Sequence, residues 1–124
     1  MSWTEEEHAP SEGTPLCLLE EIPEQQGKEF RFGTGLFPFR MFVVRREGQV
    51  WGYVNSCPHL YAPLNFRPDA FLTYDQAYIL CAVHHALFEV ESGLCLDGPC
   101  IGKSLTPVEL EIRDGQVLIA KPSP

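Results

Sequence analysis

Eleven prolines and ten glycines spread through 124 residues are the feature that most limits how this chain can fold. Proline breaks a helix interior because it lacks the backbone donor, and glycine weakens one. No window is left for a long helix. Between these residues, short segments alternate apolar and polar side chains, which is typical of half-buried strands. The sequence therefore predicts an all-β fold of short antiparallel strands.

Two hairpins are the clearest predicted elements. Residues 39–46 are rich in β-branched and aromatic side chains, and residues 50–54 return after a glycine-containing turn. Residues 108–113 alternate strictly and predict one strand, which residues 117–119 follow after Asp114-Gly115. Both patterns are hairpin signals. Shorter strands are predicted at 16–19, 77–81 and 86–90.

Length and hydropathy exclude several classes of protein. A two-domain oxidoreductase with its own nucleotide-binding unit needs about 250 residues. The longest apolar run, residues 77–83, is far shorter than the roughly 20 residues of a membrane span. The first thirteen residues carry four glutamates and no basic residue, unlike a signal peptide. We expect a cytoplasmic protein that does not contact a membrane.

The net charge of −8 is concentrated near the N-terminus, since residues 1–30 hold eight acidic residues and one basic residue. No basic face is apparent, so binding to nucleic acid is not expected. We expect residues 1–13 to be an acidic, flexible tail without core contacts. Residues 14–124 are predicted to form a single domain.

Two boxes of cysteine and histidine carry the chemistry. Cys57 and His59 follow the predicted strand that ends at residue 54, and Cys81 and His84 follow a second strand. A zinc site is one interpretation, although zinc modules usually group two cysteines and then two histidines. Mixed boxes suit a two-iron cluster better, with one iron held by two thiolates and the other by two imidazoles.

The motif C-x-H followed by C-x-x-H resembles that of the Rieske iron–sulfur proteins, and most closely the small Rieske-type ferredoxins. The similarity extends from about residue 16 to 120 and includes the Gly98-Pro99 loop. It implies three small antiparallel sheets, with a cluster-binding subdomain (about 56–101) on a β base. It also implies one [2Fe-2S] cluster, with Cys57 and Cys81 on the buried iron and His59 and His84 on the solvent-facing iron.

Departures from the family pattern concern the neighbourhood of the boxes. The 21 residues between His59 and Cys81 are more than usual, and we interpret residues 66–75 as a surface insertion. His85 follows His84, but the C-x-x-H spacing favours His84 as the ligand.

The other cysteines have simpler interpretations. Cys17 is expected in the core. Cys95 and Cys100 could close a loop as a disulfide, but we expect reduced thiols in the cytoplasm. A four-thiolate cluster of Cys57, Cys81, Cys95 and Cys100 matches no ferredoxin spacing and would leave the histidines unused.

The resemblance implies an electron carrier rather than an enzyme. A flavin-containing reductase is the expected donor, and a terminal oxygenase of the aromatic-ring dioxygenase type is the expected acceptor. Docking is expected on an apolar collar around the outer histidines, formed by Leu60, Tyr61, Pro63, Pro99 and Ile101. Two alternatives are the small Rieske-like subunit of a nitrite reductase and a zinc-stabilised binding module without a redox role.

Overall fold

The computed structural model describes residues 3, 8–33, 38–58, 63–65, 69–73, 75–82 and 85–121. Within these residues the chain forms ten strands and one short 3₁₀ helix, η2 (Leu19–Glu21). No helix of this part of the chain is long and apolar enough to cross a membrane. The strands are β1 (Pro15–Leu18), β2 (Gln26–Phe32), β3 (Phe39–Arg46), β4 (Gln49–Val54), β5 (Ile79–Cys81), β6 (Ala86–Phe88), β7 (Cys95–Asp97), β8 (Pro107–Val108), β9 (Leu110–Arg113) and β10 (Gln116–Ile119).

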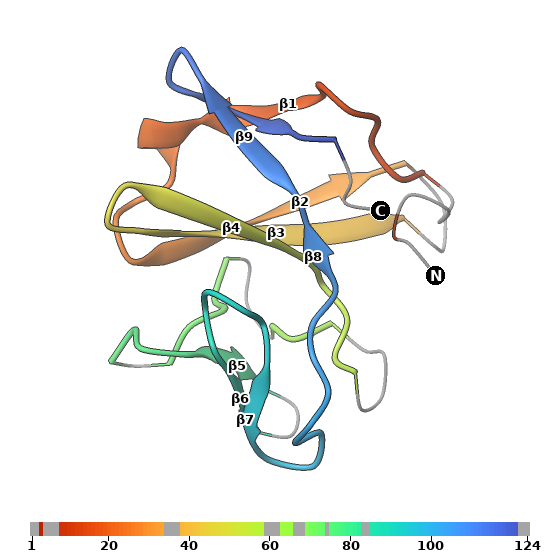
Figure 1. Cartoon of the computed structure of the whole chain (residues 1–124), viewed down its shortest axis with the longest axis vertical. Helices are drawn as coiled ribbons and strands as arrows, with labels where there is room; N and C mark the ends of the chain where they lie inside the picture. Colours follow the sequence, from red (N-terminus) through yellow and green to blue (C-terminus); the bar gives the residue numbers. More distant parts are fainter. Residues whose placement is uncertain are drawn as a thin grey trace.

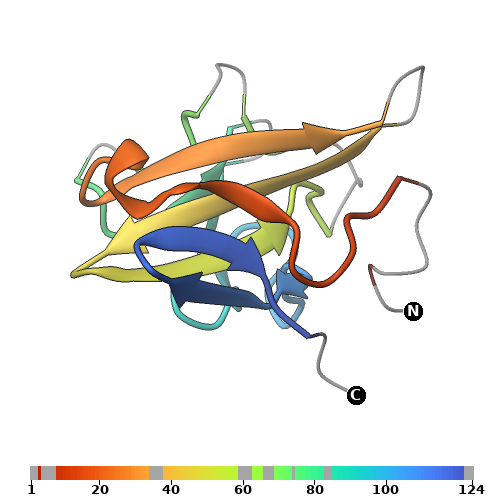
Figure 2. The ribbon, with the colours of Figure 1, turned by 90° about the horizontal axis from the view of Figure 1, so that it is seen from above.

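The strands form three antiparallel sheets, as predicted. Their orders are β1-β10-β9, β2-β3-β4-β8 and β5-β6-β7. Figure 1 shows the small β5-β6-β7 sheet below the four-stranded sheet, connected to it by long loops. Seen from above in Figure 2, the β1-β10-β9 sheet lies across the opposite face of the four-stranded sheet. The β1-β10-β9 and β2-β3-β4-β8 sheets, the two larger sheets, together form the base, and the small β5-β6-β7 sheet lies on the other side of the four-stranded sheet.

Strand β3 is buried on both faces. Phe39, Met41 and Val43 belong to the core between the two larger sheets. Phe42 and Val44 point the other way, into a second core that extends to the small sheet. Because successive side chains of a strand point to opposite faces, a nearly continuous apolar strand can join two cores. The chain uses β3 in this way to connect its base with the small sheet.

The prediction that residues 66–75 are a surface insertion is wrong at Phe71. The Phe71 side chain is buried and stacks on Phe42, with ring centroids 4.2 Å apart and planes 10° from parallel. Leu72 forms a β-bridge with Ile79. The segment therefore adds Phe71 to the second core, while Asp69, Ala70 and Asp75 are exposed.

The single strand predicted at 108–113 is divided between two sheets. Val108 of β8 is the partner of Gly52 in β4, whereas β9 pairs with β10. The division falls at Glu109. Alternation alone gives the inward face of a strand but not the sheet to which the strand belongs, so the pattern could not reveal this change.

The N-terminal segment also differs from its prediction, because Trp3 packs into the base. Its side chain is buried in the core between the larger sheets, 5.8 Å from Phe39 between ring centroids. The indole Nε1 donates a hydrogen bond to the Glu109 carboxylate at 3.3 Å. The expectation that residues 1–13 make no core contacts is therefore wrong at Trp3.

Candidate metal centre

The two cysteines of the predicted boxes are brought into one core. Cys57 lies three residues beyond the end of β4, and Cys81 is the last residue of β5. Both are fully buried, in the core between the four-stranded sheet and the small sheet. His59 and His84, the other two predicted ligands, lie outside the described residues.

The second box occupies a tight hairpin turn. Cys81 of β5 is the register partner of Ala86 of β6, so four residues connect the two strands. The backbone N–H of His85 donates to the Cys81 carbonyl at 2.7 Å, and His85 has a φ of 57°. A left-handed residue that closes a hairpin is a turn residue. The backbone of His85 thus closes the turn, and the residue is exposed.

One backbone segment joins the loops of the two boxes. The N–H of Ala82, next to Cys81, donates to the Leu64 carbonyl at 2.8 Å. The N–H of Leu64 in turn donates to Oδ1 of Asn55 at 2.8 Å, two residues before Cys57. Any shift of one loop relative to the other would break a buried hydrogen bond, so this connection fixes the separation of the two thiols.

A buried polar network anchors the same point to the base. Nδ2 of Asn55 donates to Glu29 at 3.0 Å and to Asn65 at 2.9 Å. The guanidinium of Arg40 donates to the same Glu29 oxygen at 2.7 Å. Burial opposes ionisation of Glu29, but the bonds and charge of Arg40 and the two asparagines hold its pKa below the ordinary value. Glu29 is therefore the charged centre of a network between β2, β3 and the first box.

A third loop packs against both boxes. Gly98 lies so close to Ala86 that a Cβ at Gly98 would be 2.8 Å from the Ala86 Cα, and its φ is 104°. Only glycine combines this conformation with this close approach. Two residues later, Cys100 is buried beside Cys57 and Cys95. Burial first, and then these two neighbouring sulfurs, raises the pKa of the Cys100 thiol to about 12.

The cysteines present fit an iron–sulfur group better than a purely thiolate metal site. Cys57, Cys81, Cys95 and Cys100 share one core. Among the described residues, however, no three cysteine, histidine or acidic side chains are grouped so that they could hold a metal ion. Two water-excluded thiols on hydrogen-bonded loops suit one iron of a mixed cysteine and histidine cluster. His59 and His84, the other two predicted ligands, are not among these described residues.

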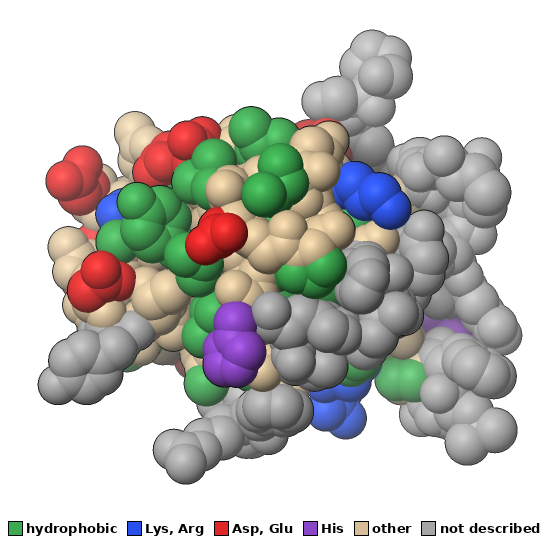
Figure 3. Space-filling view, turned by 90° about the horizontal axis from the view of Figure 1, so that it is seen from below, with side chains coloured by type: hydrophobic (Ala, Val, Ile, Leu, Met, Phe, Trp, Pro, Cys, Tyr) green, Lys and Arg blue, Asp and Glu red, His purple; other side chains and the backbone are tan. Residues whose placement is uncertain are grey.

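The surface at the end of the small sheet is partly apolar. Leu94 and Leu96 are exposed, and Ile101 is 65% exposed. Figure 3 views the molecule from this end and shows apolar side chains gathered among scattered charged ones. Of the predicted collar, Pro99 is exposed and Pro63 is half-buried, whereas Leu60 and Tyr61 lie outside the described residues.

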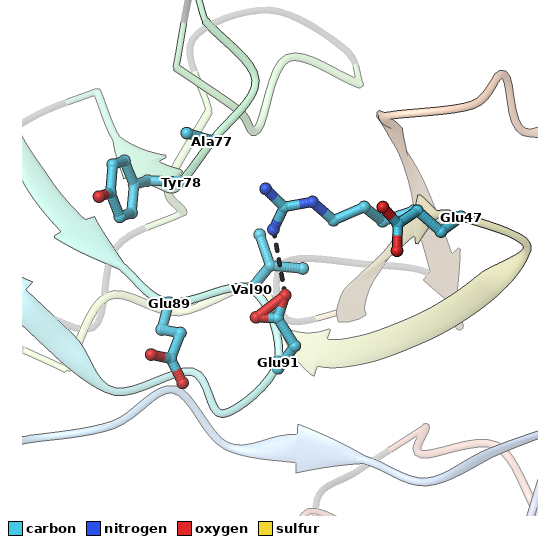
Figure 4. Close-up of a pocket in the computed structure, with 7 residues that line it drawn as sticks. Glu47, Ala77, Tyr78, Glu89, Val90 and Glu91 are labelled. Carbon is cyan, nitrogen blue, oxygen red and sulfur yellow. Dashed lines mark hydrogen bonds and ion pairs between the residues drawn. The ribbon is translucent and has the colours of Figure 1, made fainter.

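A cavity of about 410 Å³ lies elsewhere, between the β3–β4 hairpin and the turn after β6. Figure 4 shows Glu47, Glu89 and Glu91 around it. Arg46 also lines the cavity and forms an ion pair with Glu91. That ion pair measures 3.1 Å. Neither Cys57 nor Cys81 lines this cavity, so it is not part of the candidate metal centre.

Sequence reasoning found the cysteines of the centre but missed their supports. Asn55 and Glu29 were not predicted as site residues, although Asn55 precedes Cys57 by two positions. The partners of Asn55 lie 9, 10 and 26 residues away along the chain. Their proximity depends on strand pairing, which no local motif encodes. Cys17, expected in the core, is half-buried against it, and burial raises the pKa of its thiol.

Solved structures with this fold include ferredoxins and an oxygenase. The ferredoxin of carbazole 1,9a-dioxygenase from Nocardioides aromaticivorans IC177 has a TM-score of 0.70 and 20% identity, covering 90% of this chain and 100% of that one. The Sphingomonas yanoikuyae B1 ferredoxin has a TM-score of 0.65 and 23% identity, with 89% and 99% coverage. The terminal oxygenase of carbazole 1,9a-dioxygenase from Novosphingobium sp. KA1 has a TM-score of 0.68 and 21% identity, with 91% and 31% coverage. At these identities the similarity shows the fold.

Comparison at the sequence level identifies the family. A comparison with curated proteins gave no match. The family described as the Rieske [2Fe-2S] domain matches residues 13–116, a span that includes both cysteine and histidine boxes. The predicted resemblance, the predicted three-sheet fold and the predicted cofactor are thereby confirmed. The chain belongs to the Rieske [2Fe-2S] domain family, and its cofactor is one [2Fe-2S] cluster.

Proposed function

We propose that this chain is a one-electron carrier between a flavin-containing reductase and a terminal oxygenase of the aromatic-ring dioxygenase type. The observation that carries the proposal is the extent of the structural match. The chain reproduces the fold of a carbazole dioxygenase ferredoxin over 100% of that ferredoxin. It matches a terminal oxygenase over only 31% of the oxygenase chain. The match to the whole of a ferredoxin supports the carrier role.

We assign the cluster ligands as Cys57 and Cys81 on the inner iron and His59 and His84 on the outer iron. When bound, the cluster supplies one-electron oxidation and reduction. The two cysteines are fully buried, which supports their assignment to the inner position. Ligation by two neutral imidazoles raises the potential relative to a four-thiolate cluster.

The residues around the centre have separate tasks in this proposal. The second core excludes water from the two thiols, and the Asn55 network keeps the two loops in register. The exposed side chains of Leu96, Pro99 and Ile101 offer a small apolar surface near the third loop. A small contact of this kind suits a brief encounter with a redox partner, because weak electron-transfer interfaces lie at the low end of the size range.

Metal analysis is the first test. The protein, purified anaerobically, should contain about two irons and two acid-labile sulfides per chain. Its reduced form should give the low average g-value of mixed cysteine and histidine ligation. Stoichiometric zinc without labile sulfide would favour a zinc-stabilised module and contradict the proposal.

Ligand identity is tested by single substitutions. Cys57→Ser, Cys81→Ser, His59→Ala and His84→Ala should each lose the cluster and the visible colour. His85→Ala is the matched control and should keep both. Loss of colour in His85→Ala together with retention in His84→Ala would show that the second box is shifted by one residue.

Electron transfer is tested by reconstitution. The loaded chain should be reduced by NADH through a flavin-containing reductase and should support turnover by a carbazole dioxygenase oxygenase component. Cluster-free Cys57→Ser protein is the negative control. A chain that dithionite reduces but that passes no electrons to any aromatic-ring dioxygenase would contradict the acceptor assignment, and would leave roles such as a nitrite reductase subunit.

A further inference from the structure

Cys95 and Cys100 are two buried thiols that the proposed electron transfer does not use. Their sulfur atoms are 3.2 Å apart, with Cys100 as the donor, and both are free thiols. Cys95 itself donates to the Asp97 carbonyl at 3.2 Å. Thiols are weak donors and weak acceptors, so a sulfur–sulfur hydrogen bond adds little stability. The pairing therefore calls for another chemical explanation.

The backbone already holds the two cysteines on opposite sides of a closed loop. The N–H of Cys95 donates to the Lys103 carbonyl, and the N–H of Lys103 donates to the Cys100 carbonyl, both at 2.9 Å. A β-bridge between Leu94 and Ser104 closes the base of the loop. To form a bond of about 2.05 Å between the sulfurs, the side chains need to approach by little more than an ångström.

This loop covers the candidate metal centre. Gly98 packs on Ala86, the register partner of Cys81. The Cys100 thiol interacts with that of Cys57. A bond between Cys95 and Cys100 would fasten the loop to β7 at the point where it approaches Ala86 and Cys57.

The outer side of the same loop is open to solvent. Pro99 and Gly102 are exposed, and Ile101 is 65% exposed. Cys95 and Cys100 themselves are buried. A local opening of the turn at residues 98–102 would admit a molecule as small as hydrogen peroxide, whereas the rest of the core stays closed.

We propose that Cys95 and Cys100 form a reversible disulfide, produced by hydrogen peroxide, that fastens the loop over the metal centre. In the opened turn, where solvent reaches the sulfurs, one thiol loses its proton and the thiolate attacks an oxygen of the peroxide. The O–O bond breaks, the leaving hydroxide takes up the proton, and a sulfenic acid and water are formed. The second sulfur then attacks the sulfenic sulfur and releases the other oxygen as water. The two thiols lose two electrons and two protons, and the peroxide is reduced to two waters. A small thiol reductant reverses the step by thiol–disulfide exchange.

The test uses the cluster-loaded protein treated with hydrogen peroxide and then alkylated under denaturing conditions. Peptide mapping should find one link between Cys95 and Cys100, with the mass of two hydrogen atoms lost and restored by a phosphine reductant. The thiol of Cys17 should remain alkylatable, and Cys17→Ser should form the same link. Cys95→Ser and Cys100→Ser should each abolish the link while iron content and visible spectrum are kept.

Iron release measures the fastening effect. With an excess of a chelator that binds ferric iron, peroxide-treated protein should release iron several-fold more slowly than peroxide-treated Cys95→Ser. An intact cluster without the Cys95–Cys100 link would overturn the proposal, as would equal rates of iron release. A link between Cys57 and Cys100 would also overturn it, and would in addition show that Cys57 is not held by iron. Absence of iron before treatment would instead count against the proposed function.

Discussion

Replacement of Asn55 by alanine should strongly destabilise the protein. Three hydrogen bonds depend on this buried side chain: those from Nδ2 to Glu29 and Asn65, and that from Leu64 N–H to Oδ1. A neutral hydrogen bond contributes about 0.5–1.5 kcal/mol, and one to a charged group about 1.5–3 kcal/mol. The sum is about 2.5–6 kcal/mol, and the buried N–H of Leu64, left without its acceptor, adds to it.

For a chain of this length, that loss corresponds to a fall of roughly 10–20 °C in the thermal midpoint. Far-UV circular dichroism and the visible absorbance of the cluster should be followed together during heating. Both signals should be lost earlier in Asn55→Ala, since the substitution releases the loop of Cys57. Gln49→Ala, an exposed change at the start of β4, the strand that precedes Asn55, is the matched control and should leave both midpoints unchanged.

A second substitution separates the two halves of the network. Asn55→Asp keeps an oxygen for the Leu64 N–H but places a carboxylate where the donor to Glu29 stood, at 3.0 Å. Repulsion between like charges should make it at least as destabilising as alanine at neutral pH, with partial recovery as carboxylates gain protons near pH 4. If Asn55→Ala behaves like Gln49→Ala, the network does not position the first box and the reasoning is refuted.

The remaining predictions concern the base, the pH dependence, one glycine and the potential. Trp3→Ala should cost about 3–5 kcal/mol in chemical unfolding, as for other buried aromatic side chains, and an unchanged midpoint would show that the N-terminal segment is not docked. Folding lowers the pKa of Glu29, so the ionised carboxylate stabilises the folded state fully above about pH 4.3, and this stabilisation is lost as the pH falls through the lower folded pKa. Glu29→Gln should therefore be less stable at neutral pH, and its free energy of unfolding should fall less steeply in acid. Gly93→Ala, whose Cβ would be 2.7 Å from a tyrosine ring carbon, should cost more than Gly48→Ala, which has a similar φ and nothing within 4 Å; equal losses in urea unfolding would mean that the ring moves aside. The reduction potential should be about −100 to −200 mV, near the negative end of the Rieske range. Ala86→Ser adds a hydrogen-bond donor beside the second box and should raise the potential by tens of millivolts in protein-film voltammetry. An unchanged potential would mean that the hydroxyl does not reach the cluster sulfurs.

The strands that could be predicted are those with strong local patterns. The hairpin of β3 and β4 follows from apolar content and a glycine turn, and β9 and β10 follow from alternation. Strand β2 was missed because it lies at the edge of its sheet and carries charged residues, so its sequence alternates weakly. Strand β7 has only three residues. Its position depends on pairing with β6, which is information that a window of sequence does not hold.

In the candidate site, too, local sequence patterns predicted some residues and not others. The cysteines could be predicted because their chemistry demands particular residue types at a short spacing. The groups that hold them in place could not be predicted, since an asparagine or a glutamate has many uses and its partners are chosen by the fold. Residues 66–75 illustrate the limit: their length suggested an insertion, whereas Phe71 is an essential part of the core against Phe42.

The structure links the metal centre to stability through β3. One face of this strand packs in the base, where Trp3 and Phe39 meet, and the other face packs Phe42 in the core that contains Cys57 and Cys81. Arg40 of the same strand pairs with Glu29, which in turn holds Asn55. A change in the base therefore reaches the thiols through a single rigid strand and a single charged network. Since metal binding and folding are coupled wherever the ligands belong to the core, variants of the base should also change how firmly the cluster is held.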